Sequence, residues 1–453
     1  MGFIVCKFGG SSVATTERVE QIYNIIQQNS QRRCIVLSAP GKAPGVNTKV
    51  TDILINISKN FICNKDVTNE IEAVKNRYLT IYQPLGIDRN AINNVLSILD
   101  KRLKTNPRDS LKYRDALAAA GEEMHARLFA EYLKKKGMPA GYVSPKDVGL
   151  IVTPTFGDAQ CETHTTENLK KLKELCERQI VLFPGFFGIT KNGEIATFSR
   201  GGSDFTGALC AEAIDAFEYE NWTDVDGIFS ANPDYVTSPE QIPALTYKEM
   251  RELSVMGFNV FHEEAVRPVM RKKIPIRLRN TNNIENTGTL IVAERLPSER
   301  DVVGIASGGR FCSFNLNKFL MNREIGFGRK LLSIFEEMNL SFEHCPSGVD
   351  NLSIILDQNQ LGPETVNNIL RAIEERLRPD EIKTEFGIAL VAVVGEGLLH
   401  KVGVLGQAAS ALARAKINIK VVNQGSSEIS MIFGIDANDE KKAVAALYEK
   451  FFR

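Results

Sequence analysis

The sequence predicts an α/β protein, in which a mostly parallel sheet sandwiched by helices is followed by two small βαββαβ domains. Short apolar runs alternate with amphipathic helical stretches from residue 3 to residue 280, which is the pattern of a parallel sheet covered on both faces. A strand–helix–strand–strand–helix unit then occurs twice before residue 453. The length of 453 residues also exceeds that of one hydrophobic core, so several domains are expected.

The first elements follow this alternation in order. FIVCKF at 3–8 is a short strand, and GGSSVAT then opens an amphipathic helix whose apolar face is Val19, Ile22, Ile25 and Ile26. CIVLSAP at 34–40 is a second buried strand that ends in a Gly/Pro-rich loop. Further helices are predicted at 71–82, 92–103 and 115–137, and further strands at 179–188, 195–199, 218–229 and 275–280. The segment 288–300 is the expected exit from this first domain.

The repeated unit indicates an internal duplication. The interval from Asn339 to Asp357 is eighteen residues, and so is the interval from Asn418 to Asp436. EIKTEFG at 381–387 supplies the fourth strand of the first unit, whereas VVGIA at 302–306 is expected to return and complete the second, which would then enclose the first. The expected domains are therefore 1–295, 300–384 and 385–453, with 302–306 added to the last.

Composition excludes several classes of protein. The 55 basic and 55 acidic residues cancel, which argues against a nucleic-acid binder. No apolar run approaches the ~20 residues that cross a bilayer, and MGFIVCKFGG lacks the regions of a signal peptide, so a cytoplasmic protein without a membrane partner is expected. The eight scattered cysteines form no CxxC pair and the five histidines show no close ligand spacing, so we expect free thiols and no structural metal site.

Three glycine-rich turns follow predicted strands: FGGSS at 8–12, PGFFG at 184–188 and SRGGSD at 199–204. Glycine lets the backbone approach a ligand, and successive N–H groups at a helix start bind anions. Neither GxxxxGK[ST] nor GxGxxG occurs, so a Walker A loop and a dinucleotide fingerprint are both absent. Three such turns in one α/β domain, two of them beside the cations Lys7 and Arg200, favour a polyphosphate ligand.

Lys7 and Asp204 each allow two interpretations. Lys7 is either an edge-strand lysine that faces water or a phosphate contact, and its place just before a glycine turn favours the second. Arg200 offers a planar fork that suits a carboxylate. Asp204 either caps the helix TGALCAEAIDA, or orients a lysine or holds Mg²⁺.

The remaining polar candidates lie in a helix and after a strand. Glu122 and Glu123 are most simply solvated helix residues, but Glu122 would bind a substrate ammonium if it faced the site. In WTDVDGIF, Thr223 and Asp224 stand where a parallel strand ends, which is where open α/β sheets bind ligands.

At these residues the sequence resembles a known family. KFGGSSVA, PGFFG, SRGGSDFTGA and WTDVDGIF occur in the order and spacing of the aspartokinases of the amino-acid kinase superfamily, and QGSSEISMIFGID resembles the second of their paired ferredoxin-like ACT domains. GFNVFHEEAVRPV and PSGVDNLS are similar to the clostridial-type monofunctional enzymes. The resemblance implies transfer of the γ-phosphoryl group of ATP, with Mg²⁺, to the β-carboxylate of L-aspartate, which is the first step towards lysine, threonine and methionine.

Site residues carry over by motif. The resemblance implies that Lys7 stabilises the transferring phosphoryl group, that Asp204 orients Lys7, and that Arg200 and Glu122 bind the α-carboxylate and ammonium of aspartate. The rest of the aspartate pocket would be Ser38, Thr51, Phe186 and Ser203. The nucleotide side, together with Lys7, would be Gly9, Gly10, Ser11, Thr223, Asp224 and Phe229.

Two positions depart from the family pattern, and the duplicated tail implies regulation. Asp234 and Asn259 stand where many members have a nucleotide-contacting arginine and lysine, for which Lys248 or Arg251 would substitute. An amino-acid effector, lysine or else threonine, is expected in the first ACT domain, whose chains would pair as a homodimer or a dimer of dimers. The effector residues would be Lys318, Gly326, Phe327, Glu343, Ser347 and Asp350.

Two alternatives stay open at this point. One is another amino-acid kinase that acts on glutamate, carbamate or UMP, against which the paired ACT units and the combination of Arg200 with Glu122 argue. The other is a non-catalytic amino-acid sensor, which would have no need to retain Lys7 and Asp204.

Overall fold

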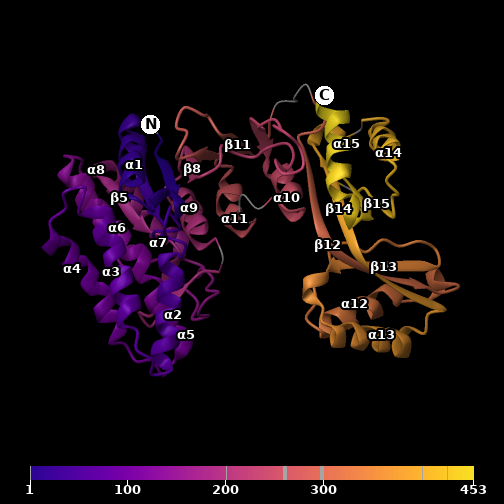
Figure 1. The fold of residues 1–453 in the computed structure, drawn as a ribbon, viewed down its shortest axis with the longest axis horizontal. Helices are drawn as coiled ribbons and strands as arrows, with labels where there is room; N and C mark the ends of the chain where they lie inside the picture. The colour runs from indigo at the N-terminus through magenta and orange to yellow at the C-terminus, as the bar shows by residue number, and fades with distance from the viewer. Residues whose placement is uncertain (1, 200, 259–262, 296–299, 400, 426) are drawn as a thin grey trace. The chain divides into compact units, whose positions relative to one another are not determined.

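The computed structural model describes residues 2–199, 201–258, 263–295, 300–399, 401–425 and 427–453 (Figure 1). The chain forms two compact units. The first contains Met1–Ile228, Gln241–Tyr247 and Asn259–Arg295, and the second contains Phe229–Glu240, Lys248–Phe258 and Leu296–Arg453. Two short stretches inside the expected 1–295 domain therefore pack with the C-terminal unit, and the domain limits drawn from the sequence stay a prediction.

The first unit is built on an eight-stranded sheet. In spatial order its strands are β3 (Ala140–Tyr142), β5 (Ile180–Pro184), β2 (Arg32–Leu37), β1 (Ile4–Phe8), β8 (Glu218–Thr223), β10 (Ile276–Asn280), β11 (Thr289–Val292) and β9 (Ala244–Thr246). All neighbours are parallel except β10 and β11. The predicted fold class, a mostly parallel sheet, is confirmed. A smaller sheet contains β4 (Ile151–Val152), β6 (Phe187–Thr190) and β7 (Ile195–Thr197).

Helices cover both faces of this sheet. One face shares a core with α1 (Thr16–Gln28), α2 (Val50–Ile62), α3 (Thr68–Tyr82), α4 (Arg89–Leu103), α5 (Ser110–Ala118) and α6 (Ala120–Lys135). On the other face α8 (Lys171–Arg178) packs on β2 and β5, and α9 (Gly202–Ala213) packs on β1 and β2. The first unit also contains α7 (Thr165–Leu169) and α11 (Glu263–Lys272), whereas α10 (Tyr247–Val255) lies almost wholly in the second unit. The predicted apolar face of α1 is buried, whereas the helix expected at 115–137 is broken at Ala119.

Strand β1 shows how the sheet separates core from chemistry. Successive side chains of a strand point to opposite faces. Ile4, Cys6 and Phe8 accordingly enter the core that contains α1 and α6. Lys7 points the other way, towards α9, at the carboxyl end of the strand.

The second unit contains one five-stranded sheet. Its order is β13 (Asn351–Asp357), β12 (Gly304–Asn317), β14 (Glu381–Val394), β16 (Ser430–Asp436) and β15 (Val421–Asn423). In the long antiparallel pair β12–β14, residues 304–308 pair with 390–394, next to β16, and 311–317 pair with 381–388, next to β13. The sequence predicted VVGIA at 302–306 as a strand of its own, but β12 continues from Gly304 through SGG at 307–309 to Asn317, with a change of register between Gly308 and Phe311.

Two helix pairs complete the second unit. α12 (Phe327–Glu337) and α13 (Pro363–Leu377) share a core with β12 and β13. α14 (Val404–Arg414) and α15 (Glu440–Phe452) share another with β14 and β16. After α12, residues 340–355 contain isolated bridges, such as the one that joins His344 to Ile355.

The inserted stretches 229–240 and 248–258 are integral to this unit. Ala231 and Val236 lie in the core of α14 and α15. Ile305 N donates to Ser230 O at 2.8 Å, and Ser430 Oγ donates to Glu252 Oε2 at 2.8 Å. Within the described ranges of both units, no helix is long and apolar enough to cross a membrane.

Candidate active site

Four loops converge where parallel strands end. β5, β2, β1 and β8 are consecutive parallel neighbours, so the loops that follow them leave from the same edge of the sheet. These loops contain the glycine turn after Phe8, the Ser38–Gly41 segment, the Gly185–Phe186 turn and the Thr223–Asp224 pair. Open α/β sheets bind their ligands at this edge, so the sequence elements singled out above meet in one place.

Lys7 and Asp204 form a buried ion pair at this edge. Lys7 Nζ lies 2.6 Å from Asp204 Oδ1, and the two side chains are only 10% and 17% exposed. The interpretation of Lys7 as an edge-strand lysine that faces water is wrong, because β1 is an interior strand of the sheet. A cation held in this way, beside a glycine turn, can neutralise charge on a phosphoryl group.

Asp204 serves this ion pair rather than the helix end. It lies in the first turn of α9, whose N-cap is Gly201 in the left-handed conformation, so the interpretation of Asp204 as an N-cap is wrong. Its Oδ1 also accepts a hydrogen bond of 2.8 Å from Asn221 Nδ2. Asn221 is the β8 residue that pairs with Lys7 across the β1–β8 ladder. Sheet and helix together therefore fix the position of the lysine.

The glycine turn after β1 packs directly against the loop after β2. Gly9 N donates to Trp222 O at 3.1 Å, and a short 3₁₀ helix, Ser11–Val13, follows. Gly41 N donates to Gly10 O at 2.8 Å, and a side chain at Gly41 would lie 2.7 Å from the Gly10 backbone. Only glycine permits this approach, which holds the predicted phosphate turn against the Ser38–Gly41 loop.

Glu122 is buried, with a free carboxylate oxygen. It is 4% exposed in the first turn of α6, so the interpretation of Glu122 as a solvated helix residue is wrong. Ala39 N donates to its Oε1 at 3.2 Å, whereas Oε2 has no hydrogen-bond partner among the residues that the structure describes. Burial raises the pKa of Glu122 to about 7. A buried carboxylate oxygen without a partner suits an incoming ammonium group.

Phe186 and Ser203 meet where the third loop touches α9. Phe186 has a φ of 79°, a conformation that costs a bulky residue roughly 1–3 kcal/mol and that is concentrated at functional sites. Thr206 Oγ1 accepts from Phe186 N at 3.1 Å and so holds this backbone. A side chain at Gly185 would lie 2.6 Å from Ser203 Oγ, so the turn and the start of α9 are in direct contact.

Thr223 and Asp224 follow β8 as predicted. Asp224 is exposed, and its Oδ1 accepts from Thr223 Oγ1 at 3.2 Å. Thr281, after the neighbouring strand β10, donates through N and Oγ1 to Thr223 O, both at 2.8 Å. Thr281 Oγ1 also lies 2.5 Å from Ser12 Oγ, which links this strand end to the glycine turn.

The remaining predicted residues fall into three groups. Arg200 and Asn259 lie outside the described residues. Ser38 lies in the loop after β2, and Thr51 is in the first turn of α2, next to Val50, whose N donates to Pro40 O at 3.0 Å. The candidates that fall in the second compact unit are Phe229, Asp234, Lys248 and Arg251.

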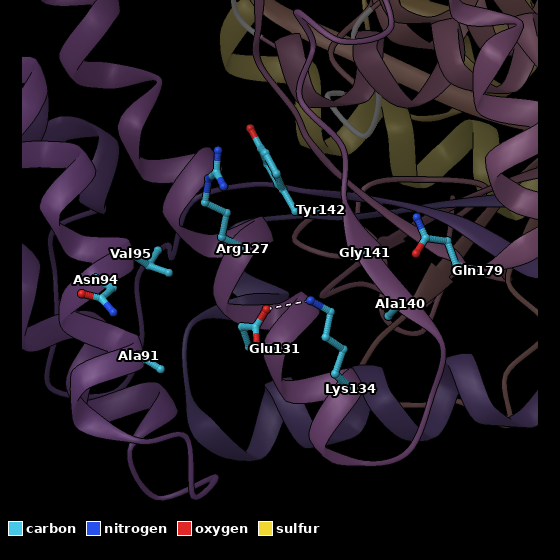
Figure 2. Close-up of a pocket in the computed structure, with 10 residues that line it drawn as sticks. All are labelled: Ala91, Asn94, Val95, Arg127, Glu131, Lys134, Ala140, Gly141, Tyr142 and Gln179. Atoms are coloured by element: carbon cyan, nitrogen blue, oxygen red, sulfur yellow. Dashed lines mark hydrogen bonds and ion pairs between the residues drawn. The ribbon is translucent and has the colours of Figure 1, made fainter.

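A pocket visible in Figure 2 is a separate feature of the first unit. It is lined by Ala91, Asn94, Val95, Arg127, Glu131, Lys134, Ala140, Gly141, Tyr142 and Gln179. No predicted site residue is among them. Glu131 is paired with Lys134 at 2.8 Å, and Arg127 is paired with Glu123 at 2.9 Å and stacks on the Tyr142 ring. Its charges are therefore already satisfied by protein groups.

Part of the predicted effector site is assembled in the second unit. Lys318 Nζ donates to Glu324 Oε2 at 2.6 Å and lies 5.4 Å from the centre of the Phe327 ring. Lys318 N donates to Asp350 O at 2.8 Å. Asp350 Oδ1 is buried and has no hydrogen-bond partner in the described chain.

The other effector candidates lie at different distances from the turn that contains Asp350. Gly326 caps α12 in the left-handed conformation, directly before Phe327, and Ser347 bridges to Leu352 at the turn that contains Asp350. Glu343 lies further along the sheet edge, where its N donates to Ile355 O. Ile355 lies five positions, or about 16 Å of extended chain, beyond Asp350, and the part of Glu343 in the effector site stays a prediction.

Sequence reasoning missed two polar residues of the site. Asn221 is a polar residue inside the buried strand β8, on the face that Lys7 occupies, and that parity was its available signal. His125 is fully buried one turn after Glu122, and its Nδ1 lies 2.7 Å from Ser38 O. A single histidine in an amphipathic helix gives no comparable signal.

Comparisons with known proteins establish the class of protein to which the chain belongs. The sequence model described as the amino acid kinase family matches residues 2–280, and one described as an ACT domain matches residues 391–451. The sheet, the loops at its carboxyl edge and the duplicated tail thus define an amino acid kinase with an ACT region.

Individual relatives narrow this class. Aspartokinase 3 of Bacillus subtilis (strain 168) is 45% identical over 448 residues, which are 99% of this chain and 98% of that protein. The chain belongs to the aspartokinases, and it is a kinase. A structure of Clostridium acetobutylicum aspartate kinase has 35% identity and a TM-score of 0.88, and the match covers 99% of this chain and 100% of that one.

Escherichia coli aspartokinase III shares the fold. Its structure with aspartate and ADP (R-state) and its structure with lysine and aspartate (T-state) each match with a TM-score of 0.77 and 24% identity, over the whole of both chains.

Proposed function

We propose that this enzyme transfers the γ-phosphoryl group of ATP to the β-carboxylate of L-aspartate and forms 4-phospho-L-aspartate, the first intermediate towards lysine, threonine and methionine. The observation that carries the proposal is the buried Lys7–Asp204 pair. It lies at the same edge of the sheet as the Ser38–Gly41 loop, whose Ala39 N donates to Glu122 Oε1. Lys7 supplies a fixed cation for a phosphoryl group, and Glu122 supplies an anion for the ammonium group of an amino acid. Family membership adds aspartate as the amino acid.

The chemistry requires positioning and charge neutralisation. A β-carboxylate oxygen of aspartate attacks the γ-phosphorus, a new O–P bond forms, and the bond to the β–γ bridging oxygen breaks as ADP leaves. Lys7 Nζ contacts the transferring group, and Asp204 with Asn221 holds that ammonium in place. Such a site needs no nucleophilic side chain, because the substrate is the nucleophile.

Aspartate is held through its α-ammonium and α-carboxylate groups. Glu122 Oε2 receives the ammonium group, and Arg200 receives the α-carboxylate in a bidentate pair. The pocket is completed by Ser38, Thr51, Phe186 and Ser203.

The nucleotide lies on the side of the glycine turn and the end of β8. Its phosphates bind Gly9, Gly10, Ser11 and Lys7, and its other contacts are Thr223, Asp224 and Phe229. ADP in the structure of E. coli aspartokinase III supports ATP as the donor. Mg²⁺ enters as part of the MgATP substrate and neutralises the phosphates.

The test is an assay of product with hydroxylamine, which traps an acyl phosphate as a hydroxamate. We expect hydroxamate that depends on both ATP and aspartate, and none when glutamate, carbamate or UMP replaces aspartate. Asp204→Asn, which keeps the shape and removes the charge, is the matched inactive control. Turnover with glutamate but not with aspartate would establish another amino-acid kinase, and the absence of any turnover would leave an amino-acid sensor.

We also propose that the second unit binds lysine as a feedback inhibitor, with threonine as the second candidate effector. The buried Asp350 Oδ1, which lacks a partner among the described residues, supports an ammonium ligand at this turn, beside Lys318, Gly326, Phe327 and Ser347. Lysine in the T-state structure of E. coli aspartokinase III supports the same ligand class. Inhibition requires that lysine bind an inactive arrangement more tightly than the active one.

Chains are proposed to pair through this unit as homodimers, which can pair again. Phe319, Ile325 and Val349 are 74%, 96% and 65% exposed around the proposed effector turn, an apolar surface that a second copy would cover. The limits 1–295, 300–384 and 385–453, with 302–306 completing the last, are retained as the domain proposal. Light scattering of the full chain with Ile325→Glu tests the dimer, which the charge is expected to dissociate.

A further inference from the structure

His125 and Glu122 grip one peptide group. They are one turn apart on the face of α6 that meets the Ser38–Gly41 loop. His125 Nδ1 lies 2.7 Å from Ser38 O, and Ala39 N donates to Glu122 Oε1 at 3.2 Å. Since Ser38 C=O and Ala39 N–H belong to the same peptide plane, the two side chains fix both ends of that plane. A rotation of this peptide would break both hydrogen bonds.

The tautomer of His125 follows from its partner. A carbonyl oxygen only accepts, so Nδ1 carries the proton and donates to Ser38 O. The ring is fully buried and meets the Tyr78 and Tyr82 rings edge-on, with centroids 6.4 and 5.8 Å away. Burial lowers the pKa of His125 to about 4, which keeps the ring neutral at physiological pH. His125 is thus a fixed hydrogen-bond donor, whose Nδ1–H is directed at Ser38 O.

Residues on both sides of the gripped peptide are hydrogen-bonded to the end of β1 and its glycine turn. On one side Ser38 N donates to Phe8 O at 3.2 Å, next to the phosphate turn. On the other side Gly41 N donates to Gly10 O at 2.8 Å. The orientation of this peptide therefore determines where Ser38 lies and which oxygen of Glu122 is free.

We propose that His125 is a positioning residue for aspartate recognition: it holds the Ser38–Ala39 peptide so that Ala39 N–H occupies Glu122 Oε1 and leaves Oε2 for the substrate ammonium. This role rests on the proposed function. It predicts that loss of the Nδ1–H donor weakens aspartate binding and leaves ATP binding nearly unchanged, since the hydrogen bonds that join this loop to the phosphate turn, from Ser38 N to Phe8 O and from Gly41 N to Gly10 O, do not involve His125.

The test compares two isosteres. Asparagine places its amide N–H near the position of Nδ1, whereas glutamine places its amide near Nε2. We expect His125→Gln to raise KM for aspartate about tenfold, the size of one lost hydrogen bond, with KM for ATP within about twofold of wild type. His125→Asn should recover most of the aspartate affinity. Tyr82→Phe is the packing control, because its buried hydroxyl has no hydrogen-bond partner within the described residues.

Hydrogen exchange supplies a second reading that does not depend on turnover. The backbone amides of Ser38, Ala39 and Gly41 should exchange faster in His125→Gln than in His125→Asn or wild type, with α6 protected equally in all three. Equal KM values and equal exchange in the two isosteres would overturn the proposal and leave His125 as a packing residue. If wild type itself fails to phosphorylate aspartate, the proposed function fails, while the exchange experiment still decides whether His125 holds this peptide.

Discussion

The charge state of Glu122 predicts that a neutral residue at this position raises stability but impairs aspartate binding. Its carboxyl group is buried, and its pKa is about 7 in the folded protein, against 4.5 for an unperturbed glutamate. Each pKa unit corresponds to about 1.4 kcal/mol, so ionising this group in the folded protein costs about 3 kcal/mol relative to the unfolded chain. Glu122→Gln removes this cost and keeps an oxygen for Ala39 N.

The sign follows from the raised pKa. Between pH 4.5 and 7 the folded protein holds a proton that the unfolded chain has lost, so the contribution of Glu122 to stability is present below about pH 4.5 and is lost as the pH rises to about 7. Glutamine does not titrate. Without ligands, the variant should therefore gain on wild type by about 3 kcal/mol between pH 4.5 and pH 8.

The assay is unfolding of the full chain, with and without aspartate, at pH 5 and at pH 8. Aspartate should stabilise wild type and leave Glu122→Gln unchanged, because the ammonium has lost its carboxylate. Glu123→Gln is the matched control: it breaks ion pairs with Arg102 and Arg127, and it should destabilise the protein at both pH values. A difference between wild type and Glu122→Gln that stays constant with pH would refute the reasoning.

Three further substitutions test the remaining roles. Lys7→Ala should lower kcat by about 10²–10³-fold, since it removes a charge that acts mainly in the transition state, and a variant with wild-type kcat would reduce the ion pair to a structural one. Arg200→Lys should raise KM for aspartate more than KM for ATP, because lysine lacks the bidentate fork; saturation curves that change for ATP alone would contradict this. Asp350→Ala should raise the lysine concentration that gives half inhibition at least about tenfold, because the effector loses an ionic contact, whereas an unchanged lysine titration would move the effector elsewhere.

The elements that could be predicted from the sequence are those with a periodic pattern of apolar residues. The apolar face of α1 is buried as predicted, and the place of Lys7 just before a glycine turn favoured a phosphate contact over a lysine that faces water. The glycine turns were recognisable because each follows an apolar strand, and such turns meet wherever the strands are parallel and adjacent. Local pattern therefore favoured the phosphate contact of Lys7, whereas for Asp204 it left open an N-cap, a partner for a lysine or a ligand for Mg²⁺.

What stayed hidden depends on contacts between distant segments. The burial of Glu122 arises because α6 packs on the loop after β2, and nothing in GEEMH distinguishes a buried glutamate from a solvated one. The role of His125 depends on the direction of one peptide. Strand β12 continues through SGG because its partner β14 is continuous, a tertiary constraint that overrides the local turn signal.

The inserted stretches 229–240 and 248–258 determine where this chain can be cut. A catalytic fragment that stops near residue 295 would keep Ala231, Val236 and Leu253 while losing the surfaces that bury them. Its exposed apolar side chains would favour aggregation, whatever the quality of the remaining sheet. A chimera that takes its second unit from a relative must exchange these stretches together with the tail, because that unit is assembled from separate segments of the chain.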